Sequence, residues 1–295
     1  MKNKLEKNYN SIFKLNTWKK NYINFHNHTI YSDWEHTVKE LLEENKELWI
    51  THVSITDHDT LDSYIKWDAL NIAKKIWITL VPGVEITVKT SKDIKFQVHI
   101  LLYLNEKLLQ NNDFINDFNK TIWNNRWIGL LKRRINSINK NFWDEWINLN
   151  LEDFNHLSLK NITTAHSAKA LEKKYPNLDQ KGITRIIWKE SPAYIKTWTS
   201  LEKMIFLRNK YDLVSVMAHP IREREIQYTK EILIYIDNLI KNNYLDWLEL
   251  VHPELTNESK IKLMKFKTNI STAGSDTHNK KVWRKVKNYN VNWIK

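Results

Sequence analysis

Histidines and acidic residues recur where apolar segments of this chain end. His26 and His28 stand two residues apart in FHNH, so both imidazoles share one face if this segment is a strand. Asp33 follows in the loop after this segment. Comparable positions in or after later apolar segments hold His58, Glu85, His99, His219, Asp276 and His278. Imidazole and carboxylate without sulfur suit zinc, manganese or iron better than calcium or magnesium. The pattern predicts a metal centre.

Each of these motifs also has a purely structural interpretation. A single strand histidine is more often a core or loop residue than a ligand, and the HxH pair alone fits either interpretation. The whole set favours a site, because a parallel barrel gathers the C-terminal ends of its strands at one mouth. Six imidazoles and three carboxylates exceed the needs of one tetrahedral ion. We therefore expect two or three divalent ions bridged by a carboxylate, with Mn, Zn or Fe as the metal.

The segments that must position these residues alternate between strand and helix patterns. Thr37 and Glu40 form a capping box ahead of the first amphipathic helix. Strand-like runs follow, separated by helices, up to about residue 104, and the same rhythm returns from about residue 192. Between residues 105 and 191 the segments are polar and helix-like. The pattern predicts an α/β fold with a mostly parallel sheet, interrupted by a helical insertion.

Composition limits the possible function classes. The 295 residues include no cysteine, which excludes disulfides, thiolate metal sites and cysteine nucleophiles. No apolar run approaches the roughly 18 residues of a membrane span, and no secretion signal is evident. We therefore expect a cytoplasmic protein without membrane association. The net charge of +12 favours a phosphorylated or polyanionic partner, although a dispersed lysine-rich surface produces the same balance.

Glycine and tryptophan occur in unusual numbers, 4 and 14 of the 295 residues. Trp49 and Trp77 follow predicted helices and Trp247 precedes a predicted strand. At such positions glycine commonly supplies a positive φ angle. We hypothesise that many of these tryptophans are glycines, encoded by UGA and translated with a genetic code that reads UGA as tryptophan. The alternative is a truly tryptophan-rich protein, and UGG codons at the three positions would establish it.

The ordered motifs FHNHTIYSDWEHT, ITDHDT, VPGVEI, VHILLY, VMAHP and AGSDTH resemble the PHP (polymerase and histidinol phosphatase) superfamily of metal-dependent phosphoesterases. The resemblance spans residues 23 to 279. It implies a distorted (βα)7 barrel, with its two parts at 20–104 and 192–282 and the helical insertion at 105–191. Three implied ligand sets are His26, His28, Glu85 and Asp276; Glu85, His99 and His219; and Asp33, His58 and His278. Superfamily members usually have glycine where this chain has Trp34, Trp49 and Trp247, which supports the miscoding hypothesis.

Within the superfamily, the insertion and the stretch SPAYIKTWTSLEKMI resemble stand-alone enzymes that act on nucleoside 3′,5′-bisphosphates and on the 5′ ends of short RNAs. The resemblance implies that a phosphorylated small molecule or short oligonucleotide is the substrate, with no obligate protein partner. Residues of the insertion would then bind the substrate phosphate, namely Arg126, Arg133, Arg134 and His166. The alternative is that they are surface residues of ordinary helices.

The implied reaction is hydrolysis of a phosphate ester by a metal-bridging hydroxide, formed because the ions lower the pKa of a shared water. Asp57 or His252 would protonate the leaving group, although nothing in the sequence fixes that role. Two other functions are compatible with the motifs. A histidinol-phosphate phosphatase fits the metal centre but not the insertion, and a non-catalytic nucleic-acid-binding module fits the fold but not the complete ligand set.

Overall fold

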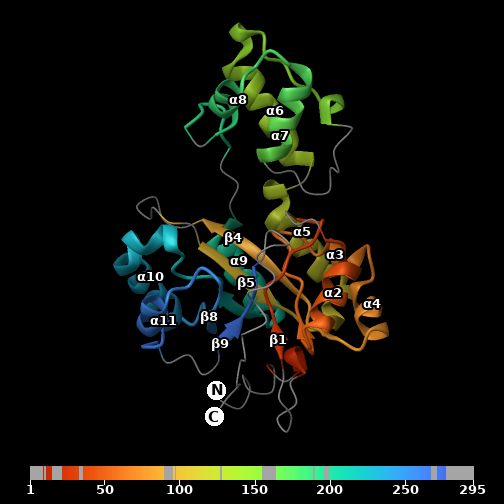
Figure 1. Cartoon of the computed structure of the whole chain (residues 1–295), viewed down its shortest axis with the longest axis vertical. Coiled ribbons are helices and arrows are strands. Elements are labelled where there is room, and N and C mark those ends of the chain that lie inside the picture. Colours follow the sequence, from red (N-terminus) through yellow and green to blue (C-terminus); the bar gives the residue numbers. More distant parts are fainter. Residues whose placement is uncertain are drawn as a thin grey trace. The chain divides into compact units, whose positions relative to one another are not determined.

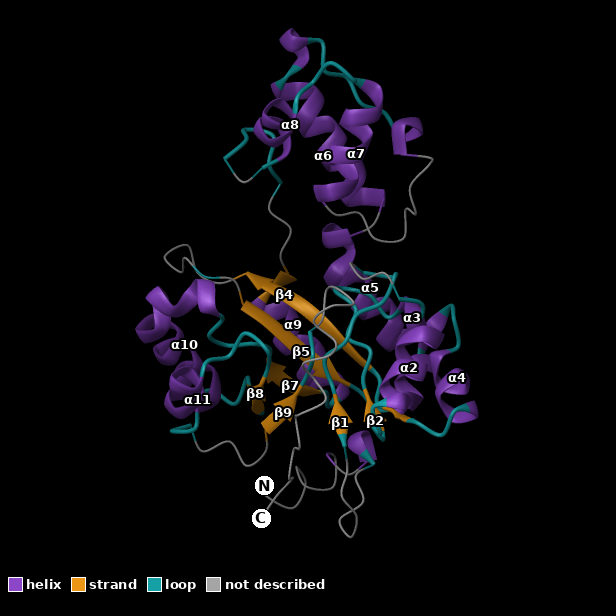
Figure 2. Cartoon of the chain, in the orientation of Figure 1, coloured by secondary structure: helices purple, strands orange, loops and turns teal. Residues whose placement is uncertain are grey.

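The computed structural model describes the chain in eleven stretches, which are residues 9, 11–14, 22–32, 36–89, 96, 98–126, 128–154, 164–188, 190–195, 199–266 and 271–276. The chain divides into two compact units, residues 1–118 together with 200–295, and residues 119–199. The first unit combines strands and helices, and the second is built from helices (Figures 1 and 2).

Two hydrogen-bonded sheets carry the first unit. The smaller sheet is parallel and has the order β1 (Ile23–Asn24), β2 (His52–Val53) and β3 (Thr79–Leu80). The larger sheet has the order β6 (Thr199–Ser200), β4 (Gly83–Lys89), β5 (Val98–Tyr103), β7 (Val214–Met217), β8 (Trp247–Val251) and β9 (Ser271–Ala273).

The two sheets meet at both ends. The backbone N–H of Phe25 donates to the carbonyl of Ala273 across 2.8 Å, which ties the end of β1 to β9. On the other side, His58 forms a parallel bridge with Glu85, which ties the segment after β2 to β4. Figure 2 shows β1 and β9 side by side. The predicted α/β barrel is confirmed, and its two seams run directly beside the candidate ligands.

Strand β5 runs against its neighbours, where the sequence pattern suggested a mostly parallel sheet. It pairs antiparallel with both β4 and β7, whereas β7, β8 and β9 are parallel to one another. Strands β4 and β5 are neighbours in sequence, and a short connection can join only antiparallel strands. The reversal places Ile100, near the start of β5, opposite Met217 at the end of β7. His99, near the start of β5, and His219, just after the end of β7, therefore lie at the same edge of the sheet, although the two strands run in opposite directions.

Helices cover the barrel on both sides. Figure 2 shows α2 (Val38–Glu47), α3 (Asp62–Ile65) and α4 (Ala69–Lys75) beside β1 and β2, and α10 (Thr229–Lys241) and α11 (Asn257–Leu263) beside β8 and β9. Helix α9 (Leu201–Tyr211) leads into β7, and the short 3-10 helices η1 (Glu106–Gln110) and η4 (Glu223–Tyr228) follow β5 and β7. The predicted capping box of α2 is confirmed, because the Thr37 hydroxyl accepts from the Glu40 N–H and Glu40 accepts in return.

Tryptophans occupy left-handed backbone positions at the ends of two of these helices. Trp49 has φ 63° and Trp77 has φ 65°, and their side chains are 81% and 88% exposed. Each follows its helix in the hydrogen-bond pattern of a Schellman motif, with Ile50 N–H bonded to Asn45 O and Ile78 N–H bonded to Ala73 O. Glycine is the usual residue there, since a Cβ atom is disfavoured at positive φ.

Trp247 does not share this conformation. It is the first residue of β8, is buried, and packs its ring 4.4 Å from Tyr9 and 5.0 Å from Phe13, measured between centroids. The expectation that this position needs the conformational freedom of glycine is wrong, because its φ is not positive and a strand accepts any side chain that packs. Trp34 lies outside the described residues.

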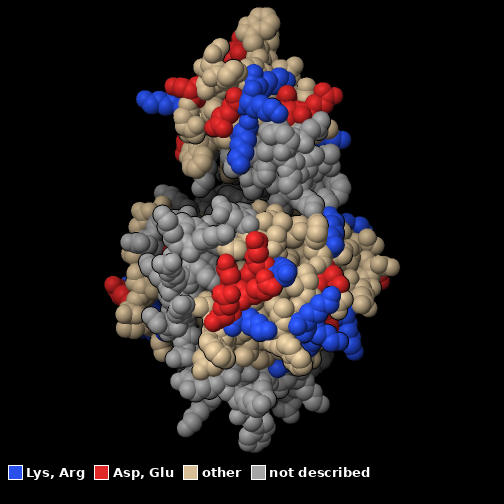
Figure 3. Space-filling view, turned by 45° about the vertical axis from the view of Figure 1, so that its right-hand side comes forward, with Lys and Arg blue, Asp and Glu red and all other residues tan. Residues whose placement is uncertain are grey.

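The second unit has its own hydrophobic core. Helix α5 (Asn112–Arg126) spans the division at residue 119, and α6 (Ile128–Asn141), α7 (Thr164–Lys174) and α8 (Gln180–Ile187) follow, with η2 (Trp143–Glu145) and η3 (Leu151–Phe154) between α6 and α7. Leu131, Phe154, Leu171 and Ile186 are completely or almost completely buried in this core. On the described part of the face seen in Figure 3, basic side chains lie next to acidic ones in both units. None of the helices that the structure describes combines the length and the apolar character of a membrane span.

Candidate metal centre

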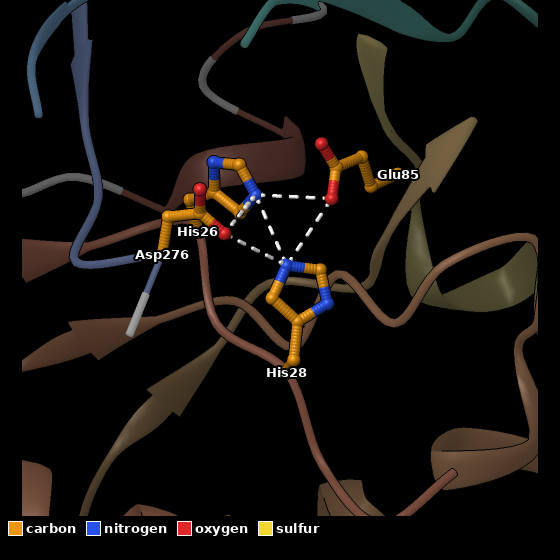
Figure 4. Close-up of side chains that lie close together, drawn as sticks. All are labelled: His26, His28, Glu85 and Asp276. Atoms are coloured by element: carbon orange, nitrogen blue, oxygen red, sulfur yellow. Dashed lines mark hydrogen bonds and ion pairs between the residues drawn. The ribbon is translucent and has the colours of Figure 1, made fainter. Parts of the chain in front are cut away.

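Four side chains from three parts of the barrel converge at the seam between β1 and β9. His26 and His28 follow β1, Glu85 lies on β4, and Asp276 follows β9 (Figure 4). The two histidine Nε2 atoms are 3.2 Å apart, and Glu85 Oε2 lies 3.2 Å from one and 3.1 Å from the other. Asp276 Oδ1 lies 3.5 Å and 3.2 Å from the same nitrogens. All four donor atoms fall within 4.8 Å of one another, a spacing that suits a shared cation.

Glu85 also belongs to a second group of donors. Its Oε1 lies 2.5 Å from His99 Nδ1 and 3.1 Å from His219 Nε2, and its Oε2 lies 3.2 Å from His58 Nδ1. His58, Glu85 and His99 form a second cluster of metal-ligand geometry. One carboxylate thus contacts five imidazoles, which is the arrangement expected of a bridging ligand between neighbouring ions.

The two candidate ligands that follow β7 and β9 have unusual backbone conformations. His219 has φ 29° and Asp276 has φ 39°, in the positive range that side chains other than glycine rarely adopt. Hydrogen bonds hold both in place, since His219 N–H donates to Glu249 Oε2 across 2.8 Å and Asp276 N–H donates to the carbonyl of His26 across 3.1 Å. Such strain, of order 1–3 kcal/mol each, is typical of functional sites that the surrounding structure holds in place.

Burial and neighbouring charge act against each other on the acidic ligands. Burial alone would raise the pKa of Glu85, but the imidazoles of His58, His99 and His26 outweigh it and hold the pKa well below its usual value. For Asp276, burial is likewise outweighed by His26 and by hydrogen bonds from His252 and His28, so its pKa is also well below the usual value. Both carboxylates are therefore ionised at neutral pH and ready to hold a cation.

The histidines respond in opposite directions. Burial alone would lower the pKa of His26, but the carboxylates of Glu249, Asp276 and Glu85 raise it well above the usual value. Burial dominates at His219 and lowers its pKa well below the usual value. The carboxylates around His26 therefore favour positive charge at this side of the cluster.

Seven of the nine predicted metal ligands lie together, and the other two are not described. The seven are His26, His28, His58, Glu85, His99, His219 and Asp276. Asp33 and His278 lie outside the described residues. Among the predicted phosphate-binding residues, the side chains of Arg126 and His166 are also outside the described set. Arg133 is exposed and Arg134 is half-buried on α6, and their proposed role in substrate binding stays a prediction.

The two predicted leaving-group acids contact the ligands and their loops. Asp57 accepts from Thr29 N–H at 2.6 Å, from the Thr29 hydroxyl at 2.7 Å, from the Ser32 hydroxyl at 2.7 Å and from the Ser63 hydroxyl. It therefore anchors the loop that follows His28. His252 Nδ1 accepts from Glu254 N–H, so the neutral ring carries its proton on Nε2, 3.0 Å from Asp276 Oδ2. Neither contact involves a substrate, and the role of acid stays a prediction.

The sequence-based reasoning missed Glu249. This residue lies on β8, is completely buried, and places both carboxylate oxygens 3.2 Å from His26 Nδ1. The available signal was an acidic residue in the middle of the apolar strand run WLELV, where a charge is costly without a partner.

Comparison with known proteins agrees with this fold. Of the 26 solved chains that match, one from Bifidobacterium adolescentis, provisionally named a metal-dependent phosphoesterase, has a TM-score of 0.62 and 22% identity over 89% of both chains. An amidohydrolase from Chromobacterium violaceum, solved with bound sulfate and no metal, has a TM-score of 0.60 and 18% identity over 87% of both chains. No curated protein matches the chain. The sequence profile of the PHP domain matches residues 24–251, most of the chain and nearly all of the strands around the metal-ligand clusters, and the chain therefore belongs to the PHP domain family.

Proposed function

We propose that this protein is a metal-dependent phosphoesterase. The observation that carries the proposal is Glu85, whose two oxygens each face a different group of imidazoles within 3.2 Å. A carboxylate in this position can join two cations, and neighbouring cations held by histidine and carboxylate are a common device for hydrolysing phosphate esters. The PHP family match and the name of the Bifidobacterium relative support the same activity.

The donor set fits divalent ions of the zinc, manganese or iron type. It combines imidazole nitrogen and carboxylate oxygen and is almost entirely shielded from water. The Nε2 atom of His99 is buried and has no hydrogen-bond partner in the described part of the chain, as expected of a nitrogen that a cation satisfies.

Two ions would each have their own ligands and share Glu85. One would be held by His26, His28 and Asp276, and the other by His58 and His99, with His219 beside the shared carboxylate. When bound, such ions lower the pKa of a coordinated water and stabilise negative charge on the phosphate. The protein's own contribution is to keep the carboxylates ionised and to hold the imidazoles in fixed orientations within a buried cluster of charged side chains. Asp33 and His278 are proposed as ligands of a third ion.

We propose nucleotides as the substrate class, either a nucleoside 3′,5′-bisphosphate or the 5′ end of a short RNA. Support comes from the resemblance of the motifs and the helical insertion to enzymes of this kind, and from the net charge of +12. Arg126, Arg133, Arg134 and His166 are proposed to bind the substrate phosphate, because the fork of a guanidinium group matches phosphate oxygens.

A substrate comparison tests the proposal. The Mn²⁺-loaded protein is incubated with adenosine 3′,5′-bisphosphate, histidinol phosphate and a 5′-phosphorylated oligonucleotide, and released phosphate or nucleotide is measured. We expect turnover of the first or third compound. Preference for histidinol phosphate would change the substrate class, and no turnover with retained oligonucleotide binding would identify a binding module instead.

Two variants connect any activity to the site. His26→Ala and Asp276→Ala each remove one donor of the first cluster, and we expect each to abolish hydrolysis while circular dichroism shows an intact fold. Full activity in either variant would refute the assignment of the site. Lys39→Ala, on the exposed face of α2, serves as a control with activity equal to that of the wild type.

A further inference from the structure

The imidazoles of the HxH pair each have a partner on the ring nitrogen that the cluster does not use. His26 directs Nε2 toward Glu85 and Asp276, and its Nδ1 lies 3.2 Å from both oxygens of Glu249. His28 likewise directs Nε2 into the cluster, and its Nδ1 lies 3.3 Å from the Ser32 hydroxyl. The same hydroxyl donates to Asp57 Oδ1 across 2.7 Å. Each histidine is thus connected to a buried acid, directly or through one hydroxyl.

We propose that Glu249 and Asp57 are positioning residues that fix the tautomer and the ring orientation of His26 and His28. A carboxylate that accepts a hydrogen bond from Nδ1–H leaves the lone pair of Nε2 free to bind a cation and makes it a better donor. The Ser32 hydroxyl transmits the same constraint from Asp57, since it donates to the acid and so accepts from His28 Nδ1–H. The inference rests on the proposed function, because it assumes that the cluster binds metal ions.

The surroundings of Glu249 support this role. Its side chain is completely buried, and in the described chain its carboxylate forms hydrogen bonds with the His26 ring and the backbone N–H of His219. No lysine or arginine among the described residues forms an ion pair with it. A buried carboxylate is costly without a positive partner, and among the described residues the ionisable side chain that pairs with Glu249 is the candidate ligand His26. A role in orienting the ring of His26, a candidate metal ligand, explains both why Glu249 is buried and why His26 is its partner.

Close packing fixes the geometry of the Glu249–His26 pair. Gly274, between β9 and Asp276, lies so close that a Cβ atom there would be 2.1 Å from His26 Cβ and 2.5 Å from Glu249 Oε1. No side chain other than hydrogen fits at this point. The segment that carries Asp276 therefore packs directly against the Glu249–His26 pair, which leaves the His26 ring little freedom to rotate.

Metal affinity of a Glu249→Gln protein tests the proposal. Glutamine keeps the size of the side chain but loses the charge and one of the two acceptor oxygens. We expect Mn²⁺ affinity, measured by competition with a chelator, to fall about 10- to 100-fold relative to the wild type. The visible absorption spectrum of the Co²⁺-substituted protein should also change, because it reports the ligand field of the histidines and not the stability of the fold.

Asp246→Asn is the matched control. Asp246 stands immediately before β8 with its side chain buried, but its hydrogen bonds are with Arg208 and Ser215, and none with a candidate ligand is found among the described residues. Its substitution should lower the melting temperature and leave Mn²⁺ affinity and the Co²⁺ spectrum within twofold of wild-type behaviour. If Glu249 were only a structural acid, its variant would behave in the same way, and that result would overturn the proposal.

Ser32→Ala provides a second, milder test that does not place an altered charge in the core. It removes the hydroxyl between Asp57 and His28, and we expect a several-fold loss of Mn²⁺ affinity with an unchanged fold. Wild-type affinity in folded Ser32→Ala and Glu249→Gln proteins would refute this inference alone. Failure of the wild-type protein to bind Mn²⁺ or to hydrolyse any phosphate ester would instead refute the proposed function, and this inference with it.

Discussion

The buried carboxylate of Asp57 connects two separate segments of the chain through hydrogen bonds. Thr29, Ser32 and Ser63 all donate to it, and the loop that presents His28 is thereby fixed to the segment after β2. We expect Asp57→Asn to lower the free energy of unfolding by about 2 kcal/mol or more, because buried donors would lose a charged acceptor. Urea denaturation of the metal-free protein measures this loss without interference from metal binding.

Asp62→Asn is the control for that measurement. Asp62 is also buried, but its carboxylate pairs with the half-exposed Lys66 across 2.7 Å. Such a pair contributes less than about 1 kcal/mol, so its loss should shift the urea midpoint only slightly. Equal losses in the two variants would mean that Asp57 is no more than an ordinary buried acid.

The shared ligand Glu85 should matter more for metal content than any single histidine. Glu85→Gln removes the charge common to both clusters, and we expect the purified protein to lose metal from both. His99→Gln affects only the second cluster and should leave about half of the bound metal. Elemental analysis after dialysis measures the metal content. A Glu85→Gln protein that retains as much metal as His99→Gln would contradict the bridging role.

At the level of residues, the sequence was most informative where spacing alone defines proximity. His26 and His28 could be paired because alternate residues of an extended segment share a face, and Glu85, His219 and Asp276 could be added because they end other apolar runs. Glu249 could not be found in this way. Its contact with His26 depends on β8 pairing with β9, which in turn joins the end of β1, and strand order is not visible in a hydrophobic pattern.

The ends of the helices offer a direct test of the miscoding hypothesis. Trp77 has φ 65° and an indole that is 88% exposed, so it bears backbone strain with little gain from packing. We expect Trp77→Gly to stabilise the protein by about 0.5–1 kcal/mol, because relief of strain exceeds the added entropy of the unfolded chain. Thermal or urea denaturation measures the difference.

Trp188→Gly is the corresponding control. Trp188 also follows a helix, α8, and is 54% exposed, but its φ is −77°, where glycine brings no relief. This variant should be neutral or less stable than the wild type. If both variants respond alike, backbone strain is not the explanation. Codons at Trp49 and Trp77 give an independent answer, since UGG there would show that tryptophan is the encoded residue.

At the level of elements, alternation of strands and helices predicted the α/β fold, and the Thr37 capping box predicted the start of α2. The direction of β5 was not predictable in the same way. Hydrophobic periodicity distinguishes a strand from a helix, but it is identical for a strand read in either direction. His99 was therefore expected inside its strand without an explanation of how it reaches a rim formed by strand ends.

For the whole molecule, the metal-ligand clusters and most of the predicted insertion belong to different units. Every described candidate ligand lies in the first unit, whereas the second unit has a separate core around Leu131, Leu171 and Ile186. Bound metal stabilises only the structure that binds it. We expect EDTA to increase hydrogen exchange at the amides of β4, β5 and β7, and to leave exchange in α6 and α8 unchanged.

Hydrogen exchange followed by mass spectrometry resolves the two units in one experiment. Magnesium-EDTA, which does not remove tightly bound Mn²⁺ or Zn²⁺ as readily, serves as a control for effects of the chelator itself. Equal loss of protection in α6 and α8 would show that the metal stabilises the chain as a single cooperative body.

The seam between β1 and β9 has a consequence for how the protein is made. Phe25 and Ala273 pair across it, and His26 and Asp276 contribute to the same cluster although 250 positions separate them along the chain. During synthesis, a nascent polypeptide that still lacks β9 cannot complete this set of donors. We therefore expect the complete set of donors to form only after Asp276 has left the ribosome, so that full metal affinity arises late in the folding of this unit.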